Sequence, residues 1–152
     1  MLLNQPDASS SSLSLVSVAS AQTRQYHFVS TPLNWTEAQS FCRQVYTDLA
    51  TIENTADVSA VNATTSNYTG KFSAWIGLYD DLVNSWRWSL DNSSFYGEGE
   101  TEFRNWDLNP VQPNNQLGQQ YCVVLYGGRL GTWGDTECSM ELQFVCYAGK
   151  VF

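Results

Sequence analysis

The chain has 152 residues, which is enough for one domain with a single core and too few for two. Fifteen acidic and seven scattered basic side chains give a net charge of −8, and this balance disfavours nucleic acid and anionic membranes as partners. No apolar run approaches the roughly 18 residues of a membrane span, so we expect no membrane insertion by this chain.

The first 24 residues are polar and rich in serine. Their one apolar run, SLSLVSVASA, ends in the small-residue pattern Ala19-Ser20-Ala21, which is typical of a signal cleavage site, but no positive charge precedes it. Polar low-complexity sequence buries too little surface to offset its ordering entropy. We expect residues 1–24 to be a disordered leader, a linker or a poor signal peptide, and residues 25–149 to form the domain.

A short aromatic strand is predicted over residues 24–29, and the dipeptide Thr31-Pro32 is expected to end it. The next segment, 34–46, predicts the clearest helix of the chain. Asn34 stands at its N-cap with Glu37 three residues further on, and its apolar residues recur at helical spacing.

A second, weaker helix is predicted over residues 54–65, after a brief extended connection at 47–52. Asn54 is placed to cap this helix, and Asp57 lies in its first turn, where a negative charge interacts favourably with the helix dipole.

The pattern changes from residue 73 onward to short apolar segments separated by polar, glycine-rich loops. Residues 91–120 have little periodicity, and long irregular loops within a compact domain are usually functional. Two helices followed by several strands predict an α+β domain. The predicted strands cover residues 74–80, 85–91, 120–128 and 142–148.

The cysteines number four, with no Cys-x-x-Cys pair, and His27 is the one histidine, so the sequence makes zinc improbable. An even number of cysteines favours disulfides, for which three pairings are possible. A bridge between Cys42 and Cys146 would close a loop of about 100 residues and stabilise the fold by about 4–5 kcal/mol in the chain-entropy model. A bridge between Cys122 and Cys138 would close the base of the long loop.

An extracellular or secreted location is expected from the disulfides together with four Asn-x-Ser/Thr glycosylation acceptors. Such acceptors also arise by chance, and a capping role of the first one would compete with glycosylation. The four glycosylation acceptors are Asn34, Asn62, Asn67 and Asn92.

Aromatic residues make up 14% of the chain. Trp35, Trp75 and Trp133 are expected in the core, because they lie on the apolar face of a helix or within strands. The long loop also carries aromatic residues that could anchor a protein partner, since aromatic side chains dominate binding energy at protein interfaces. These are Tyr96, Phe103 and Trp106.

Catalysis has little support in the sequence. His27 has no Ser, Cys or acid in a motif relation to it, and no phosphate-binding glycine loop is present. The acidic group Glu98, Glu100 and Glu102 could hold a cation, although alternating glutamates in a glycine-rich loop are usually solvated. We expect a binding protein and not an enzyme.

Several motifs together resemble the C-type lectin-like domain family over residues 25–147. They are WTEAQSFC in the first helix, WIGL at 75–78, Gln112-Pro113-Asn114 in the long loop, and the terminal WGDTEC and FVC. The resemblance implies an α+β fold with two helices flanking antiparallel sheets and a long irregular ligand-binding loop. It also implies Cys42 paired with Cys146 and Cys122 paired with Cys138, the short form with two disulfides, and a cis peptide bond before Pro113.

Sugar-binding members of that family hold a calcium ion with an acid-Pro-Asn motif, a second acid before a cysteine, and an Asn-Asp pair after a tryptophan. Of the three carboxylates, Asp135 alone remains here. If each lost carboxylate costs about 2 kcal/mol, calcium affinity falls about a thousandfold. Residual calcium binding would rest on Asn114 and Asp135. The positions of this chain that correspond to the family's calcium ligands are Gln112, Asn114, Gln120, Gly134 and Asp135.

The family's auxiliary calcium site is depleted in the same way. Asp80 is kept, whereas neutral residues stand where acids are expected, at Asn84, Asn115, Gln120 and Tyr121. The upstream acids Asp107 and Glu102 are further candidate ligands. Alternatively, the amide run satisfies backbone groups of its own loop through Asx-turns.

The resemblance therefore implies a ligand-recognition module for which carbohydrate binding is the family expectation and calcium dependence is doubtful. The partner would be a glycan or a protein. The alternative is a calcium-independent protein–protein interaction module of the same fold, which would use the aromatic and amide residues of the long loop.

Overall fold

The computed structural model describes residues 25–66, 68, 71–82, 85–90 and 100–149. The expectations for residues 1–24 and for Asn67, Asn84, Asn92, Tyr96 and Glu98 lie outside these ranges. The elements follow one another as β1 (Gln25–Leu33), α2 (Trp35–Val45), β2 (Asp48–Leu49), α3 (Thr55–Thr64), β3 (Phe72–Asp80), β4 (Trp86–Trp88), the 3₁₀ turns η1 (Glu100–Glu102) and η2 (Gln116–Gly118), β5 (Cys122–Gly127), β6 (Thr132–Thr136) and β7 (Leu142–Ala148).

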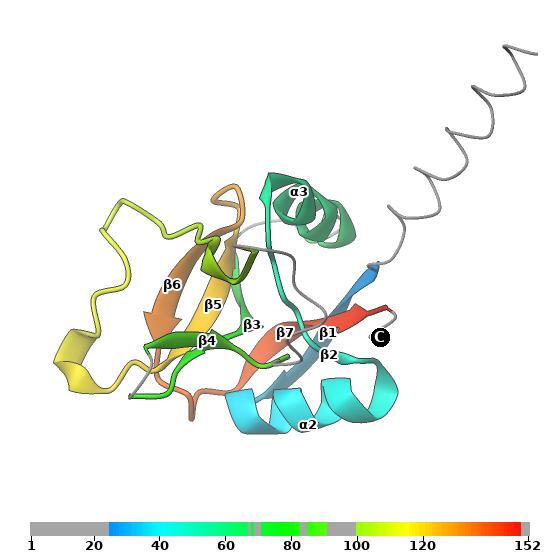
Figure 1. The fold of residues 1–152 in the computed structure, drawn as a ribbon, viewed down its shortest axis with the longest axis horizontal. Helices are drawn as coiled ribbons and strands as arrows, with labels where there is room; N and C mark the ends of the chain where they lie inside the picture. Colours follow the sequence, from blue (N-terminus) through cyan, green and yellow to red (C-terminus); the bar gives the residue numbers. More distant parts are fainter. Residues whose placement is uncertain (1–24, 67, 69–70, 83–84, 91–99, 150–152) are drawn as a thin grey trace, which may run out of the picture.

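One twisted sheet with strand order β1-β7-β3-β5-β6 forms the middle of the domain, and β2 and β4 pair with β7 and β3. Figure 1 shows α2 and α3 on opposite sides of this sheet. The α+β class and the two flanking helices are thus confirmed. The expectation of purely antiparallel strands needs one correction, because β3 and β7 run parallel, with Trp75 opposite Phe144.

Both helices begin as their sequences predict. The Asn34 side chain accepts a hydrogen bond from the Glu37 backbone N–H at 2.9 Å, and the Glu37 carboxylate accepts one from the Asn34 N–H at 3.1 Å, which completes a capping box. At α3, the Asn54 side chain accepts from the Asp57 N–H at 2.8 Å. These caps are local, so a short stretch of sequence contains all the information they require.

The first strand is longer than predicted. β1 continues through Thr31 and Pro32 to Leu33, with a shift of register between Val29 and Leu33. The strand lies at the edge of the sheet, where the missing N–H of a proline removes no ladder hydrogen bond. The expectation that Thr31-Pro32 ends the strand was therefore wrong.

The C-terminal strands also differ in extent from the predicted ones. Of residues 85–90, the described part of the predicted strand 85–91, only Trp86–Trp88 is a strand. β6 was not predicted, because its sequence TWGDT contains Gly and Asp, both of which are poor strand formers. It forms because five of its residues pair in register with β5.

Apolar side chains fill both sides of the sheet. The cluster on the α3 side includes Val61 and Trp133, and the cluster on the α2 side includes Trp35 and Trp75. The indole N–H of Trp35 donates to the Ile76 carbonyl at 2.9 Å. The expectation that Trp35, Trp75 and Trp133 belong to the core is confirmed, with exposures of 7%, 0% and 0%.

Two disulfides join the ends of the domain and the base of the long loop. They link Cys42 to Cys146, 104 positions apart, and Cys122 to Cys138, 16 positions apart, which confirms the pairing implied by the family resemblance. Of the helices in the described part of the chain, none is long and apolar enough to cross a membrane.

Candidate functional site

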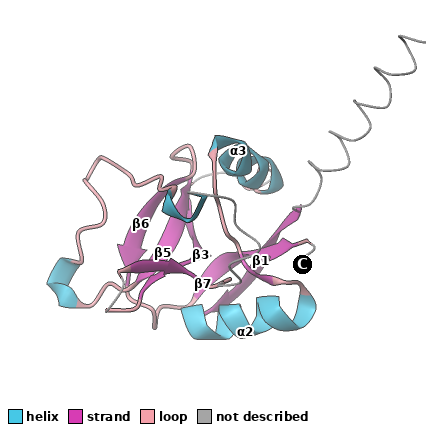
Figure 2. Cartoon of the chain, viewed as in Figure 1, coloured by secondary structure: helices cyan, strands magenta, loops and turns pink. Residues whose placement is uncertain are grey.

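The described part of the long loop is attached to the outer edge of β6. The Trp133 N–H donates to the Asn105 carbonyl at 2.9 Å, and the Asp107 N–H donates to the Trp133 carbonyl at 2.8 Å. Residues 105–107 therefore lie beside the strand as a short parallel bridge, which Figure 2 shows as pink loop next to β6. This attachment pairs the outward backbone groups of Trp133 and gives the loop a defined position.

Aromatic side chains fill the space beneath the loop. Trp106 lies 5.2 Å from Trp86 and 6.0 Å from Trp133, measured between ring centroids, and Phe103 lies 5.9 Å from Trp133. Both loop residues are partly buried and pack against the core cluster on the α3 side. Because both rings pack against the sheet and stay partly exposed, the expectation that Phe103 and Trp106 anchor a protein partner remains a prediction.

The carboxylate of Asp107 holds the loop to the turn between β5 and β6. It accepts hydrogen bonds from the Asn109 N–H and the Thr132 hydroxyl, both at 2.9 Å, and pairs with the Arg129 guanidinium at 3.1 Å. The hydrogen bond from Asn109 is the largest cause that lowers the pKa of Asp107, burial opposes it, and Thr132 and Arg129 lower it further. Asp107 is a structural anchor of the loop.

Two cis peptide bonds, Asn109-Pro110 and Gln112-Pro113, shape the next turn, so the family expectation for Pro113 is confirmed. The Gln112 N–H donates to the Asp107 carbonyl at 2.8 Å. The Gln112 side chain is buried, with 9% of the residue exposed, and its Oε1 atom has no donor among the described residues. An unsatisfied buried acceptor costs about 1–3 kcal/mol and favours any ligand group that can donate to it.

Asp135 lies at the centre of the site and is 2% exposed. Its Oδ1 atom accepts from the Asn114 N–H at 3.0 Å, and its Oδ2 atom accepts from the Asn115 N–H at 2.7 Å. Both carboxylate oxygens are therefore bonded to the backbone of the loop. The one acid that remains at the lectin-site positions fastens the loop to β6.

The amide side chains of the loop also bind its own backbone. The Gln116 N–H lies 3.2 Å from Asn114 Oδ1 and 2.7 Å from Gln120 Oε1, and the Gln120 N–H donates to Asn115 Oδ1 at 2.8 Å. The bond from Gln116 to Asn114 has the Asx-turn pattern predicted as an alternative role for the amide run, and the other two satisfy further backbone N–H groups of the loop. Three of the four predicted site residues, Gln112, Asn114 and Gln120, thus surround the fourth, Asp135.

Gly134 leaves room for a side chain from the neighbouring strand. A Cβ atom at Gly134 would lie 2.7 Å from Tyr126 Cζ and closer still to the Tyr126 hydroxyl. A side chain at position 134, where the family motif has an amide, would therefore overlap this tyrosine. Burial is the largest cause that raises the pKa of Tyr126, and Asp107 and Asp135 add to it while Arg129 opposes them.

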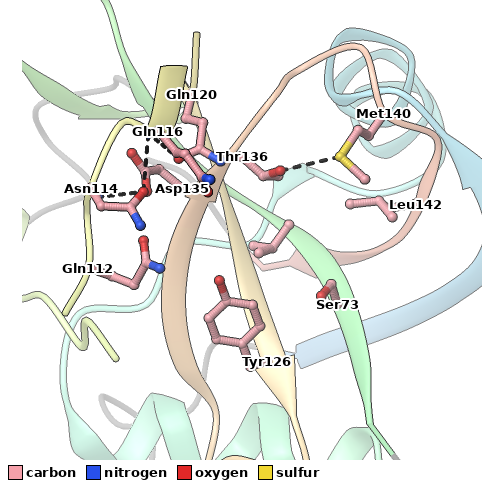
Figure 3. A pocket seen from close by; sticks show the side chains of 11 residues that line it. Ser73, Gln112, Asn114, Gln116, Gln120, Tyr126, Asp135, Thr136, Met140 and Leu142 are labelled. Atoms are coloured by element: carbon pink, nitrogen blue, oxygen red, sulfur yellow. Dashed lines mark hydrogen bonds between the residues drawn. The ribbon is translucent and has the colours of Figure 1, made fainter. Parts of the chain in front are cut away.

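These groups line a hollow of about 180 Å³, shown in Figure 3. The amides of Gln112 and Asn114 face one another on one side of it, and the Tyr126 ring extends along the sheet below them. Sequence reasoning did not identify Tyr126, Ser73, Thr136, Met140 or Leu142 as lining residues. The sequence signal that could have pointed to Tyr126 is Gly134. The family motif has an amide side chain at this position, and a glycine there leaves space for a neighbouring residue.

The residues present do not fit a calcium ion. Calcium prefers six to eight oxygen ligands, several of them carboxylates, whereas the described residues contain no group of three or more Asp, Glu, His or Cys side chains arranged to hold a metal. Both oxygens of Asp135 already accept N–H groups, and Asp107 is paired with Arg129. At the auxiliary positions, Asp80 Oδ1 accepts from the Leu82 N–H at 2.8 Å.

Comparisons with known proteins agree with this architecture. Residues 31–148 match the family described as Lectin C-type domain. L-selectin of Mus musculus is 31% identical over 128 residues, which cover 82% of this chain and 32% of that protein. The chain thus spans about a third of the length of this curated relative.

Solved structures are similar in fold. Human lithostathine superimposes with a TM-score of 0.69 at 24% identity, covering 85% of this chain and 94% of that chain. The carbohydrate-recognition domain of cow CD23, determined in the presence of a GlcNAc2Man3 oligosaccharide, superimposes with a TM-score of 0.66 at 26% identity, covering 86% and 92%.

Proposed function

This chain belongs to the C-type lectin domain family, and from that premise we propose that it binds a carbohydrate directly, through the amide and hydroxyl groups of its long-loop hollow and without a bridging calcium ion. It is a ligand-recognition module and not an enzyme. The two disulfides and the family support the proposal of an extracellular or secreted location.

The observation that carries the proposal is the buried Oε1 atom of Gln112 beside a hollow lined with polar side chains. Sugars present many hydroxyl groups, each of which donates one hydrogen bond and accepts others. If the Gln112 side chain turns toward the hollow, a sugar hydroxyl group would donate to its Oε1 atom, and the same hydroxyl could accept from Tyr126 or the Gln and Asn amides. Small-ligand sites commonly use a few polar groups of this kind to fix orientation.

A direct mode of binding is favoured over a calcium-bridged one by the charges of the site. A divalent ion would have to displace the Asn114 and Asn115 N–H groups from Asp135 and would gain one carboxylate in return. The neutral amides of Gln112 and Gln120 would compensate poorly for that loss, since calcium affinity follows the charge of its ligands.

The experiment measures capture by immobilised mannose, galactose and N-acetylglucosamine in calcium and in EDTA, together with the thermal midpoint during a calcium titration. We expect capture that EDTA does not change and a midpoint that several millimolar calcium leaves unshifted. A saturable rise in midpoint with capture that EDTA reverses would contradict the direct mode, because a ligand bound by the folded state alone must stabilise it.

Gln112→Met is the informative variant. It removes an unsatisfied buried oxygen while keeping a similar volume, so stability should be unchanged or higher. Sugar capture should fall about tenfold if a hydroxyl donates to this oxygen, corresponding to about 1.4 kcal/mol. Equal capture by both forms of the protein would remove Gln112 from the binding site.

A second candidate function is a protein–protein interaction, and exposed aliphatic side chains favour it. Leu108, Val111 and Leu130 are 77%, 66% and 86% exposed. They lie on two segments that are joined by the hydrogen bond from Arg129 to the Asn109 carbonyl, at 2.8 Å. Absence of capture by all three sugars, in calcium and in EDTA, would favour this function over carbohydrate binding.

A further inference from the structure

The hollow lined by Gln112, Asn114 and Gln120 of the long loop adjoins a second one on the same face of the sheet. The second hollow has a volume of about 370 Å³, and the two share Ser73, Tyr126 and Leu142 as lining residues. Helix α2 packs against another part of this face, around Trp75 and Phe144. The two hollows therefore adjoin one another over the starts of β3 and β7 and the end of β5, and we call the two together the groove.

The two ends of this groove differ in electrostatic character. The neutral amides of Gln112, Asn114, Gln116 and Gln120 line the loop end, which suits hydroxyl groups. Lys71 and Arg129 line the other end, which favours an anion. This placement is distinctive in a chain with fifteen acidic and seven basic side chains.

The two cations differ in their availability. Arg129 pairs with Asp107 at 3.1 Å and lies 5.4 Å from the centroid of the Tyr126 ring, so its position is fixed by the protein. Lys71 is exposed, and no carboxylate of the described residues lies within 4.0 Å of its ammonium group. An anionic ligand group would therefore bind chiefly to Lys71, with Arg129 as a fixed neighbour.

We propose that the groove binds an acidic oligosaccharide, with hydroxyl groups at the Gln112 end and a sugar carboxylate at the Lys71 end. This inference rests on the proposed function and specifies its ligand class. Hydroxyl groups on both sides of the groove, from Ser73, Tyr126 and Thr136, match a hydroxyl-rich ligand.

An acidic peptide fits less well. Extended peptides commonly bind by adding a strand to a free sheet edge. The nearby edge of β6 is occupied at Trp133, which exchanges hydrogen bonds with Asn105 and Asp107 of the long loop, so a peptide could not pair along the whole strand. A peptide in the groove would have to leave its own backbone groups without such partners.

The test compares trigalacturonate with its methyl ester by isothermal titration calorimetry of the full chain. The two probes share their hydroxyl groups and differ in charge. We expect trigalacturonate to bind about fivefold more tightly than the ester at low salt, as for a partly exposed ion pair, and the difference to shrink as salt rises.

Two variants separate the parts of the groove. Lys71→Gln should abolish the preference for the acid and leave ester binding unchanged, whereas Gln112→Met should weaken both probes by the same factor. Arg87→Gln is the matched control. Arg87 lies on β4, pairs with Asp81 and does not line either hollow. It should bind both probes as the unmodified chain does.

Each other outcome overturns the inference. Equal binding of acid and ester would remove the acidic specificity while the carbohydrate function stands. Binding of a hexaglutamate peptide as tightly as trigalacturonate would replace the oligosaccharide with a peptide. No binding of either trigalacturonate form would reject the groove, and the proposed function would fail with it only if the neutral monosaccharides were not captured either.

Discussion

At the scale of single residues, the site differs from a calcium-bridged one through what has replaced the missing ligands. Backbone N–H groups of Asn114 and Asn115 bond to both oxygens of Asp135. The Tyr126 side chain fills the space left by Gly134. A side chain at position 134 and the large ring at position 126 would therefore compete for the same volume.

Gly134→Ala tests this coupling. The added methyl group would overlap the Tyr126 ring, so we expect the free energy of unfolding to fall by about 1–3 kcal/mol, as in other overpacked sites. Tyr126→Val removes the ring and should make the same glycine substitution much less costly. Urea denaturation of both single variants and the double variant measures the coupling energy.

Gly118→Ala provides the control. Its φ of +70° makes a side chain unfavourable, but nothing lies within 4 Å of its added Cβ. Its cost should therefore be about 1–2 kcal/mol from the backbone alone and should add to that of Tyr126→Val without coupling. Strict additivity for the Gly134 pair as well would show that the two sites do not compete for space.

At the scale of elements, the long loop has a defined position because it is joined to β6 and to the turn that precedes it. Asp107 makes both connections, through its backbone to Trp133 and through its carboxylate to Thr132 and Arg129. Its folded-state pKa is lowered chiefly by the Asn109 N–H. The unfolded state therefore binds a proton more readily than the folded state does.

This difference predicts a pH dependence. A lowered folded-state pKa adds stability that is fully present above the unfolded value, near 3.9, and is lost as pH falls through the folded value. The free energy of unfolding should thus decrease from about pH 5 downward, and Asp107→Asn should make that decrease smaller. Urea midpoints between pH 7 and pH 3 measure it, with Glu141→Gln as an exposed control. An unchanged acid slope in Asp107→Asn would contradict the role of this carboxylate.

At the scale of the whole molecule, two disulfides of very different span hold the mixed sheet and its helices together. The Cys42–Cys146 bridge spans 104 positions and joins α2 to β7, while the Cys122–Cys138 bridge spans 16 and lies at the base of the long loop. The chain-entropy model assigns about 4.7 kcal/mol to a loop of 100 residues and about 3 kcal/mol to one of 15.

Removing each bridge should therefore have unequal effects. We expect Cys42→Ala/Cys146→Ala to lower the free energy of unfolding more than Cys122→Ala/Cys138→Ala, by about 1–2 kcal/mol in the chain-entropy model. Urea denaturation under non-reducing conditions compares the two. A larger loss from the shorter bridge would indicate that native packing around Cys122, and not loop length, sets the contribution.

The sequence by itself determined the features that depend on neighbouring residues. The caps at Asn34 and Asn54 were predicted correctly because their partners lie three residues away. The motif order indicated the family, and it selected Gln112 and Asp135 as candidate site residues, which the structure places in the lining of one hollow. The shortage of carboxylates at the lectin-site positions could also be read directly from the chain.

Only the tertiary structure decided features that depend on segments far apart in the chain. Sequence reasoning without the family resemblance left three disulfide pairings open, and it ended β1 at a proline that the sheet edge tolerates. It could not show that the Asn114 and Asn115 N–H groups bond to Asp135, or that Tyr126 fills the space beside Gly134. Each of these depends on which backbone and side-chain groups meet across the sheet, and that is set by packing of the whole domain.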